Sequence, residues 1–381
     1  MTVEQLKQIP AFKYYFPPEM VDSIVSDIRR LLESGDYLTL GRYTEQFEKE
    51  YAVYVGTKHA IAMASGTSSL EAILRAINVK GREVIVPTNT FAATAFAVIH
   101  AGGRPVFSDI ERDLSFDPED MKKKLNSNTS AIIAVHIGGF ISSAFEELRK
   151  FAQEKGIPLV EDAAHAQGSM TQGKKAGNLS EAAGFSFFST KVITSGEGGM
   201  ITTNNDEVAR AVRLLRDQGK VSGNSVGILG YNWRMSEFQS VVGLAQLRRI
   251  EEIISKRMKI AERYDRDLSN LSAIQCLYPP KQSRPNFYKY ILFLHSGRHP
   301  EDLRQLMKKK FGISLSGYVY EAPLHSQKVF ADYINGNDRY PVADDLCYRH
   351  VCLPLYPQMT VDDADYVANS LVDALKELGW A

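Results

Sequence analysis

Residues 59–110 read HAIAMASGTSSLEAILRAINVKGREVIVPTNTFAATAFAVIHAGGRPVFSDI, a stretch in which short apolar runs alternate with segments of helical period. Runs of four to seven residues bounded by polar turns are typical of buried strands, and longer runs with apolar residues three and four apart are typical of helices. We expect strands at 59–65, 83–88 and 104–110 and helices at 68–77 and 91–101. A single helix between successive strands predicts crossover units, and therefore a mostly parallel, doubly wound α/β sheet with helices on both faces.

The alternation continues along the chain. We expect further strands at 131–137, 157–164, 184–188 and 199–204, and a further helix at 145–156. Residues 18–54 have a helical period interrupted by the loop SGDYLTLGRY, and residues 235–268 predict one long helix that leaves the sheet. Beyond Pro279 and Pro280 the pattern predicts a smaller α+β unit. We therefore predict a large α/β domain at 1–250 and a small C-terminal α+β domain at 251–381.

Charge and cysteine content limit the partners of this chain. Lys+Arg and Asp+Glu are both 45 among 381 residues, a balance that argues against nucleic acid or an anionic membrane as the main partner. The three cysteines lack the spacing of a zinc site or of a disulfide framework, so we expect reduced thiols and no metal. The N-terminus lacks the apolar core of a secretory signal, and no stretch approaches the about 20 apolar residues of a membrane span. We expect a cytoplasmic protein.

Lys191 lies in the sequence GFSFFSTKVITSGEGGM, between an aromatic strand and a turn of small residues. An isolated lysine is ordinarily a solvated surface charge. In a tight turn after a buried strand, however, the amine would be desolvated, which lowers its pKa and leaves the neutral, nucleophilic form that a Schiff base requires. The context of Lys191 therefore suggests a covalent bond to an aldehyde cofactor, pyridoxal phosphate.

Such a cofactor needs three further groups, and the sequence offers a candidate for each. Asp162 ends the strand IPLVED, where a carboxylate would keep the ring nitrogen protonated. The turn SGTSS before a helix would offer backbone N–H groups to the phosphate, although such a turn is more often only a helix cap. Phe91 is placed to stack on the ring, and His165 to lie near its other face or its hydroxyl. Each signal is weak alone, but their order along the chain is more specific.

In that order the chain resembles the DegT/DnrJ/EryC1/StrS family of sugar aminotransferases, which has the aspartate aminotransferase fold, type I of the pyridoxal-phosphate enzymes. The resemblance extends over almost the whole chain. The segments that carry it are YLTLGRYTEQFEKEYAVYVGTKHAIAMASGTSSLEAILRA, EVIVPTNTFAATAFAV, VEDAAHAQGS, FSFFSTKVITSGEGGMITTN, GYNWRMSEFQSVVGLAQL, PLHSQ and LPLYPQMT.

The resemblance implies a role for particular residues. Lys191 is expected to form the internal aldimine, and Asp162 to pair with the pyridine nitrogen. Asn232 is expected to reach the cofactor phosphate of the neighbouring subunit, which implies a homodimer with shared active sites. The further residues expected at the cofactor are Gly66, Thr67, Ser68 and Ser186 around the phosphate, Phe91 on the ring and His165 near its hydroxyl. Thr39 and His325 are expected near the substrate.

The reaction that the resemblance implies is a ping-pong transfer of an amino group from L-glutamate, released as 2-oxoglutarate, to a nucleotide-linked keto-sugar. Two alternatives stay open at this point: a pyridoxal-phosphate sugar dehydratase and a non-catalytic pyridoxal-phosphate-binding regulator. Related dehydratases carry histidine in place of the lysine, so Lys191 argues against the former. A dinucleotide-dependent sugar enzyme is disfavoured because no GxGxxG turn follows the first strand.

Overall fold

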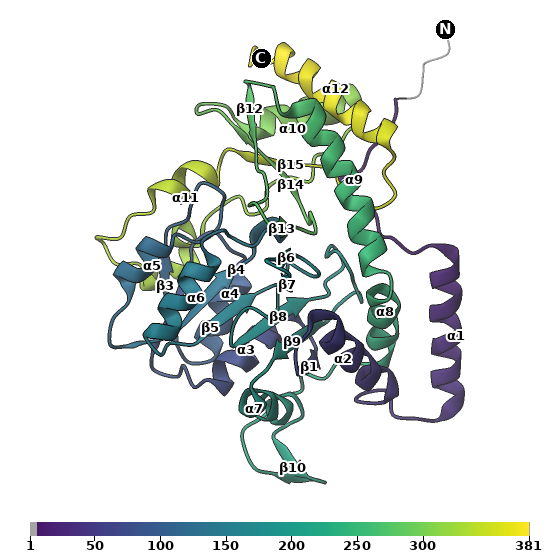
Figure 1. Cartoon of the computed structure of the whole chain (residues 1–381), viewed down its shortest axis with the longest axis vertical. Coiled ribbons are helices and arrows are strands. Elements are labelled where there is room, and N and C mark those ends of the chain that lie inside the picture. The colour runs from purple at the N-terminus through teal and green to yellow at the C-terminus, as the bar shows by residue number, and fades with distance from the viewer. Residues whose placement is uncertain (1–5, 381) are drawn as a thin grey trace.

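The computed structural model describes residues 6–380 and is built around a seven-stranded sheet (Figure 1). Neighbouring strands are parallel from β8 to β3, whereas β9 runs antiparallel to both β1 and β8. In spatial order the strands are β1 (His59–Met63), β9 (Gly199–Thr203), β8 (Ala182–Ser186), β5 (Leu159–Asp162), β4 (Thr129–Val135), β2 (Glu83–Pro87) and β3 (Arg104–Ser108). The predicted doubly wound, mostly parallel sheet is confirmed.

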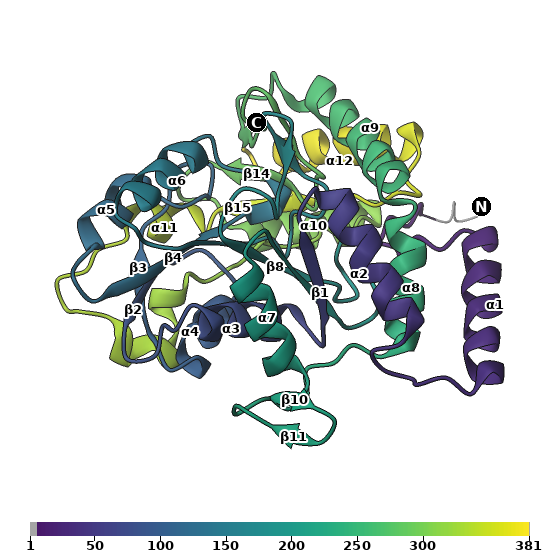
Figure 2. The same ribbon diagram turned by 60° about the horizontal axis from the view of Figure 1, so that its bottom comes forward.

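Helices cover both faces of this sheet (Figure 2). Alternate residues of each strand point to opposite faces, so one strand contributes apolar side chains to both faces. In β4, Ile133 belongs to the hydrophobic cluster on one face and Ile132 to the cluster on the other. One face is covered by α3 (Gly66–Ala76), α4 (Ala92–His100) and α7 (Asp206–Arg216). The other is covered by α2 (Arg42–Val55), α5 (Pro118–Lys124), α6 (Phe145–Glu154) and α8 (Glu237–Leu247). The central strands are therefore buried on both sides.

The C-terminal part has a sheet of its own, in the antiparallel order β12 (Ile274–Cys276), β14 (Tyr290–Leu294) and β15 (His350–Leu353). Around it lie α9 (Ile250–Leu268), α10 (Pro300–Phe311), α11 (Pro341–Leu346) and α12 (Val361–Glu377). The N-terminal segment joins this part through the bridge between Ile9 and Ile313. The domain boundary at residue 250 stays a prediction, although α9 begins there.

Residues 235–268 were expected to form one helix, and that prediction is wrong. The chain forms α8 and α9, which are separated at Arg248 and Arg249 without a glycine or proline. These two arginines pair with Glu50 and Glu19, each at 2.8 Å. The change of direction between them keeps the apolar faces of both helices buried, with Val241, Leu244, Leu247, Ile250 and Ile254 all in the core. Tertiary packing has thus overridden a continuous helical period.

Several short elements have no signal in the alternating pattern. They are the hairpin of β10 (Lys220–Ser222) and β11 (Ser225–Val226) and the small sheet of β6 (Met170–Thr171), β7 (Lys174–Lys175) and β13 (Ser283–Arg284). The helix α1 (Pro18–Ser34) stands at the edge of the molecule beside α8 (Figure 1). Among residues 6–380, none of the helices has the length and apolar character that crossing a bilayer requires.

A buried carboxylate connects the N-terminal helices to the rest of the large domain. Glu237, fully buried at the start of α8, accepts hydrogen bonds from the backbone N–H groups of Gly41 at 3.0 Å, Tyr43 at 2.8 Å and Thr44 at 3.0 Å. The Thr44 hydroxyl also donates to it. Because Gly41 has no side chain to cap α2, the cap comes from a residue about 200 positions away. The same contact holds the loop that contains Thr39, which bridges to Ser236.

Replacing this carboxylate should destabilise the fold. In Glu237→Gln, an amide NH₂ would face backbone donors, so we expect the free energy of unfolding to fall by roughly 2–4 kcal/mol. Urea denaturation followed by circular dichroism measures this. Glu45→Gln, an exposed change in the first turn of the same helix, is the matched control and should stay within about 0.5 kcal/mol of the wild type. Equal stability of the two variants would contradict the capping role.

Candidate active site

A cavity of about 380 Å³ lies at the carboxyl ends of the parallel strands. Its walls come from the N-termini of α3 and α4, the end of β5, the end of β8 and the segment after it, the two residues before β14, and residues 318–320. Seven of the residues expected at the cofactor line it together: Gly66, Thr67, Phe91, Asp162, His165, Ser186 and Lys191. They come from segments up to 125 positions apart, so the sheet edge gathers them.

Lys191 lies in the loop between β8 and β9, which its own backbone holds in a tight shape. The Lys191 N–H donates to the carbonyl of Phe188 at 2.9 Å, and the Ser195 N–H donates to that of Phe187 at 3.1 Å. Burial lowers the pKa of the Lys191 ammonium below its usual range. The charge of Lys289 lowers this pKa further, whereas Tyr288 and Asp162 raise it. A lowered pKa raises the fraction of neutral amine, the form that attacks a carbonyl.

Asp162 ends β5 with its carboxylate held in a fixed orientation. Its Oδ2 accepts a hydrogen bond from the Thr94 hydroxyl at 2.7 Å, and its Oδ1 accepts one from the Ala164 N–H at 3.2 Å. The Thr94 hydroxyl in turn contacts that of Thr90 at 2.8 Å. Asp162 is only 7% exposed, so the negative charge is available inside the cavity rather than to solvent.

The turn before α3 is both a helix cap and a donor of free N–H groups. Ser65 and Ser68 form a capping box, in which the Ser68 N–H donates to Ser65 Oγ at 3.1 Å and the Ser65 N–H donates to Ser68 Oγ at 3.0 Å. The N–H groups of Gly66 and Thr67 have no acceptor within the described part of the chain. They face the cavity at a helix N-terminus, which is a favourable place for an anion.

Glycine is required at position 66 by the close approach of the neighbouring strand. A Cβ on Gly66 would lie 2.8 Å from Cβ of Ser186 and 3.2 Å from its Cα. This approach places the Ser186 side chain beside the turn, and Ser186 lines the same cavity as Gly66 and Thr67.

Aromatic rings form a layered wall across the cavity. The Tyr320 ring is stacked between Phe91, at a centroid distance of 6.0 Å, and His165, at 5.7 Å. His165 also stacks on Tyr288 at 4.2 Å, and its Nε2 lies 3.0 Å from the Tyr320 hydroxyl. Burial, with Lys191 and Lys289, holds the pKa of His165 well below its usual range, so the ring is neutral. Its buried Nδ1 has no partner among the described residues and can serve a bound ligand.

Four of the expected residues do not line the cavity. The N–H and hydroxyl of Ser68 are used in the capping box, and Thr39 pairs with Ser236. His325 is held by Thr88 at 2.7 Å and Asp344 at 2.9 Å, and it stacks on Tyr340. Asn232 is exposed beside the hairpin of β10 and β11 and pairs with Asp217. The roles expected for these residues stay predictions.

The sequence did not point to several residues that line the cavity. Tyr288 and Lys289 precede β14, and Tyr320 lies in the irregular segment that follows α10, in parts of the chain assigned to the small domain. Thr94 lies in the first turn of α4 and orients Asp162. It belongs to the segment EVIVPTNTFAATAFAV, but the sequence assigned no role to it. Only the run of aromatic residues in NFYKY was a signal, and aromatic runs in strands are usually core.

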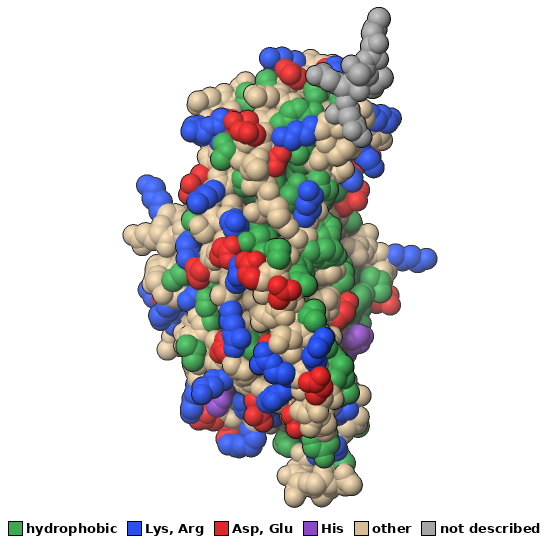
Figure 3. Space-filling model, turned by 90° about the vertical axis from the view of Figure 1, so that its right-hand side faces the viewer, with side chains coloured by type: hydrophobic (Ala, Val, Ile, Leu, Met, Phe, Trp, Pro, Cys, Tyr) green, Lys and Arg blue, Asp and Glu red, His purple; other side chains and the backbone are tan. Residues whose placement is uncertain are grey.

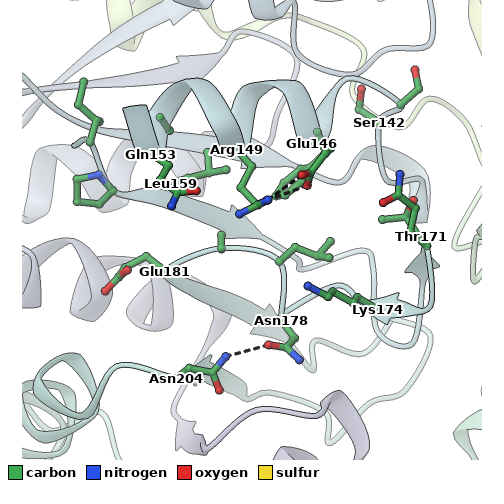
Figure 4. Close-up of a pocket in the computed structure, with 18 residues that line it drawn as sticks. Ser142, Glu146, Arg149, Gln153, Leu159, Thr171, Lys174, Asn178, Glu181 and Asn204 are labelled. Atoms are coloured by element: carbon green, nitrogen blue, oxygen red, sulfur yellow. Dashed lines mark hydrogen bonds and ion pairs between the residues drawn. The ribbon is translucent and has the colours of Figure 1, made fainter. Parts of the chain in front are cut away.

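A second hollow, of about 590 Å³, lies at the opposite ends of the strands, beside α6 and the start of β5 (Figure 4). Among its polar groups, Arg149 pairs with Glu146 at 2.7 Å, and the Asn204 side chain donates to that of Asn178 at 2.9 Å. The lysine on its wall, Lys174, is exposed, so the chemistry points to the cavity with Lys191.

A buried amine of lowered pKa, a carboxylate and an anion cradle in one cavity suit a single group, because a phosphorylated pyridine aldehyde needs all three. The residues fit it. The N–H groups of Gly66 and Thr67 with Ser186 would hold the phosphate, Asp162 the ring nitrogen, His165 Nδ1 the ring hydroxyl and Lys191 the aldehyde. Fold and site thus define a pyridoxal-phosphate enzyme of the aminotransferase fold.

Comparison with known proteins gives the family. The model of the DegT/DnrJ/EryC1/StrS aminotransferase family matches residues 18–372, so the chain belongs to this family of pyridoxal-phosphate-dependent aminotransferases. It is 32% identical to GDP-perosamine synthase of Vibrio cholerae, with 89% of this chain and 93% of the relative covered. It is also 32% identical to dTDP-3-amino-3,4,6-trideoxy-alpha-D-glucose transaminase of Micromonospora megalomicea subsp. nigra, with 93% and 95% covered.

A solved structure supports the same cofactor and fold. NtdA of Bacillus subtilis, with bound cofactor PMP, superimposes with a TM-score of 0.88 at 26% identity, covering 98% of this chain and 87% of that one. PMP is pyridoxamine phosphate, the aminated form of the cofactor. The resemblance noted from the sequence is confirmed for the family, the fold and the cofactor.

Adding a methyl group at Gly66 should weaken cofactor binding. In Gly66→Ala the new Cβ would press on Ser186 and displace the phosphate cradle, an overpacking cost of about 1–3 kcal/mol, which would raise the dissociation constant about 5-fold to 150-fold. Titration of the apoprotein with pyridoxal phosphate, followed by absorbance, measures it. Gly336→Ala, where a Cβ has open space, is the matched control and should bind like the wild type. Unchanged affinity in Gly66→Ala would contradict the assignment.

Proposed function

We propose that the protein transfers an amino group from L-glutamate to the ketone of a nucleotide-linked sugar, in two successive half-reactions at Lys191. The observation that carries the proposal is the shared cavity of Lys191, Asp162, Gly66 and Ser186 in a member of an aminotransferase family. Ping-pong kinetics would follow, because both substrates use the same amine and the first product leaves before the second substrate enters.

Bound pyridoxal phosphate supplies an aldehyde for the amino group and a protonated ring that takes up electrons from the substrate carbon. Lys191 Nζ would be the base that removes the proton from the donor α-carbon. It would hold and return that proton at the reacting atoms, and it would perform the same proton transfer in reverse for the sugar. Its lowered pKa suits this work, because the amine must be neutral to accept a proton.

The other residues of the cavity hold the reacting groups in place. Asp162, oriented by Thr94, would keep a proton on the ring nitrogen, and neutral His165 would hydrogen-bond to the ring hydroxyl without adding charge. Phe91 is 60% exposed at the mouth of the cavity, where ring stacking would shield it. Its present partner, Tyr320, would have to shift for the cofactor to occupy the space between Phe91 and His165.

The sugar nucleotide is proposed from the names of the relatives. One is a GDP-perosamine synthase and another acts on a dTDP-linked amino sugar, so the shared chemistry is a nucleoside diphosphate joined to a sugar. These two relatives differ in nucleotide and in the sugar that they make. The proposal therefore names the class and leaves the base and the aminated carbon to assay.

We also propose a homodimer in which Asn232 of each chain completes the partner's site. Asn232 is exposed and lies beside the β10–β11 hairpin, away from the Lys191 cavity of its own chain. The face that carries α1 shows hydrophobic side chains along its length (Figure 3). On α1, Val21, Val25 and Leu32 are 42%, 54% and 60% exposed. An apolar face of this kind is typical of a subunit interface.

Borohydride reduction tests the central role of Lys191. Reduction of the holoenzyme followed by peptide mapping should place the pyridoxyl group on Lys191, and L-glutamate should release 2-oxoglutarate while converting the cofactor to its aminated form. Lys191→Arg should keep the charge but slow this step by roughly 100-fold to 10,000-fold. A label on the neighbouring Lys289, or a spectrum that L-glutamate leaves unchanged, would contradict the proposal and favour the non-catalytic regulator.

Mixed dimers test the shared site. Lys191→Ala and Asn232→Asp should each be inactive as homodimers, the latter because a carboxylate would face the cofactor phosphate. A heterodimer of the two, purified by two affinity tags, has one site with both residues intact and should recover about half of the wild-type rate, since one of its two sites works. If Asn232 served its own chain, neither site would be intact and the heterodimer would stay inactive.

A further inference from the structure

We propose that a second cavity, on the far side of Lys191, binds the diphosphate of the sugar nucleotide. This cavity, called here the basic cavity, has a volume of about 340 Å³ and is lined by Lys13, Arg257, Lys289 and Arg304 together with Lys191. It shares Thr190, Lys191, Tyr288 and Lys289 with the cofactor cavity, so the two meet at the reacting amine. The inference rests on the proposed function and assigns residues to its second substrate.

The charge of the basic cavity is one-sided. Four basic side chains besides Lys191 line it, and among residues 6–380 no aspartate or glutamate does. Arg304 pairs with Glu301 at 2.7 Å, whereas Lys13, Arg257 and Lys289 have no carboxylate within 4 Å among residues 6–380. Like charges gathered in a partly buried space repel one another, and a bound anion with two phosphates would relieve that repulsion.

Arg257 is a buried cation that hydrogen bonds hold in a fixed position. It is 7% exposed and donates to the Phe287 carbonyl at 2.9 and 2.7 Å and to the Tyr288 carbonyl at 2.9 Å. Burial lowers the pKa of Arg257 to about 10, so the guanidinium is still charged at neutral pH. These bonds also fix the backbone that presents Lys289. Because Arg257 has no counter-ion among residues 6–380, an anionic ligand in the basic cavity would be stabilised by its charge.

The two lysines nearest the reaction have free donors. Lys289 Nζ lies 5.4 Å from the centroid of the Tyr288 ring, and Lys191 Nζ lies 5.1 Å from the same centroid. The protein acceptor of Lys289 Nζ is the Ser316 carbonyl, at the long distance of 3.5 Å. Lys289 is therefore next to the reacting amine and can hold a phosphate oxygen while the sugar lies at Lys191.

The outer wall is an N-terminal segment fixed to the body of the protein. The Ile9 N–H donates to the Gly312 carbonyl at 3.0 Å, and Gln246 Nε2 donates to the Tyr15 carbonyl at 2.8 Å. Between these anchors lie Lys13, over the Tyr356 ring at 5.6 Å, and the exposed aromatic pair Phe12 and Tyr14, 5.3 Å apart. The segment therefore presents a cation and two aromatic rings at the rim of the basic cavity.

These features favour a nucleoside diphosphate over the two carboxylates of L-glutamate. Four cations besides Lys191 match two adjacent phosphates, whereas L-glutamate carries one net negative charge. The rings of Phe12 and Tyr14, 42% and 52% exposed, offer faces on which a base can stack. L-glutamate has no ring that could stack on them. The ketone would then lie at Lys191, the diphosphate against Lys289 and Arg304, and the base at the rim.

Titration calorimetry of the holoenzyme with UDP, GDP and dTDP tests the proposal. At least one nucleotide should bind, and Lys13→Gln and Lys289→Gln should each weaken that binding by about tenfold, with a smaller dependence on salt. Lys308→Gln, an exposed change on the helix that carries Arg304, is the matched control and should bind like the wild type. Lys13 does not contribute to the lowered pKa of Lys191, so its variant separates binding from catalysis.

The half-reaction with L-glutamate completes the test. Its half-saturating concentration should stay within about twofold of the wild type in Lys13→Gln, because the donor does not use this residue. Failure of all three nucleotides to bind the wild type, or equal binding by the Lys13→Gln variant, would overturn the inference. A rise in the half-saturating concentration of L-glutamate alone would also overturn it and assign the basic cavity to the donor. None of these results affects the labelling of Lys191, which tests the proposed function by itself.

Discussion

Parallel strands joined by helices all end at the same edge of the sheet, and the chemistry of this protein is built on that edge. The end of β5 provides Asp162, the segment after β8 provides Lys191, and the helices that follow β1 and β2 begin beside them. The antiparallel strand β9 returns the lysine loop to the sheet and closes it into a tight turn. Residues far apart in sequence therefore meet at this edge.

Burial of polar groups is the second constraint. Lys191 is buried where its ammonium is disfavoured, while Asp162 is held by hydrogen bonds that keep its oxygens in place. The neutral His165 stacks within the aromatic wall without adding a charge. The cavity thus holds a reactive amine and a carboxylate side by side, because each has a distinct set of neighbours.

Segments outside the sheet decide what can reach the amine. The N-terminal segment, anchored at Ile9 and Tyr15, forms one wall of the basic cavity, and Arg257 on α9 fixes the backbone of Tyr288 and Lys289 from behind. Glu237 likewise caps α2 from α8 and holds the loop with Thr39. In each case, one buried polar side chain ties two distant segments together, so the fold and the shape of the site depend on the same contacts.

The sequence alone determined the class of fold and the family, and it predicted the residues of the cofactor site. Alternating strands and helices predicted the sheet. Lys191, Asp162 and Gly66 were predicted from their places after a strand or before a helix, and Ser186 was predicted from the family resemblance. Only the tertiary structure showed Tyr320 between Phe91 and His165, the break between α8 and α9, and the gathering of Lys13, Arg257, Lys289 and Arg304. Periodicity records which side of an element is buried. It does not record which distant side chains share a cavity, because their energies depend on burial and charge that arise only when the segments pack together.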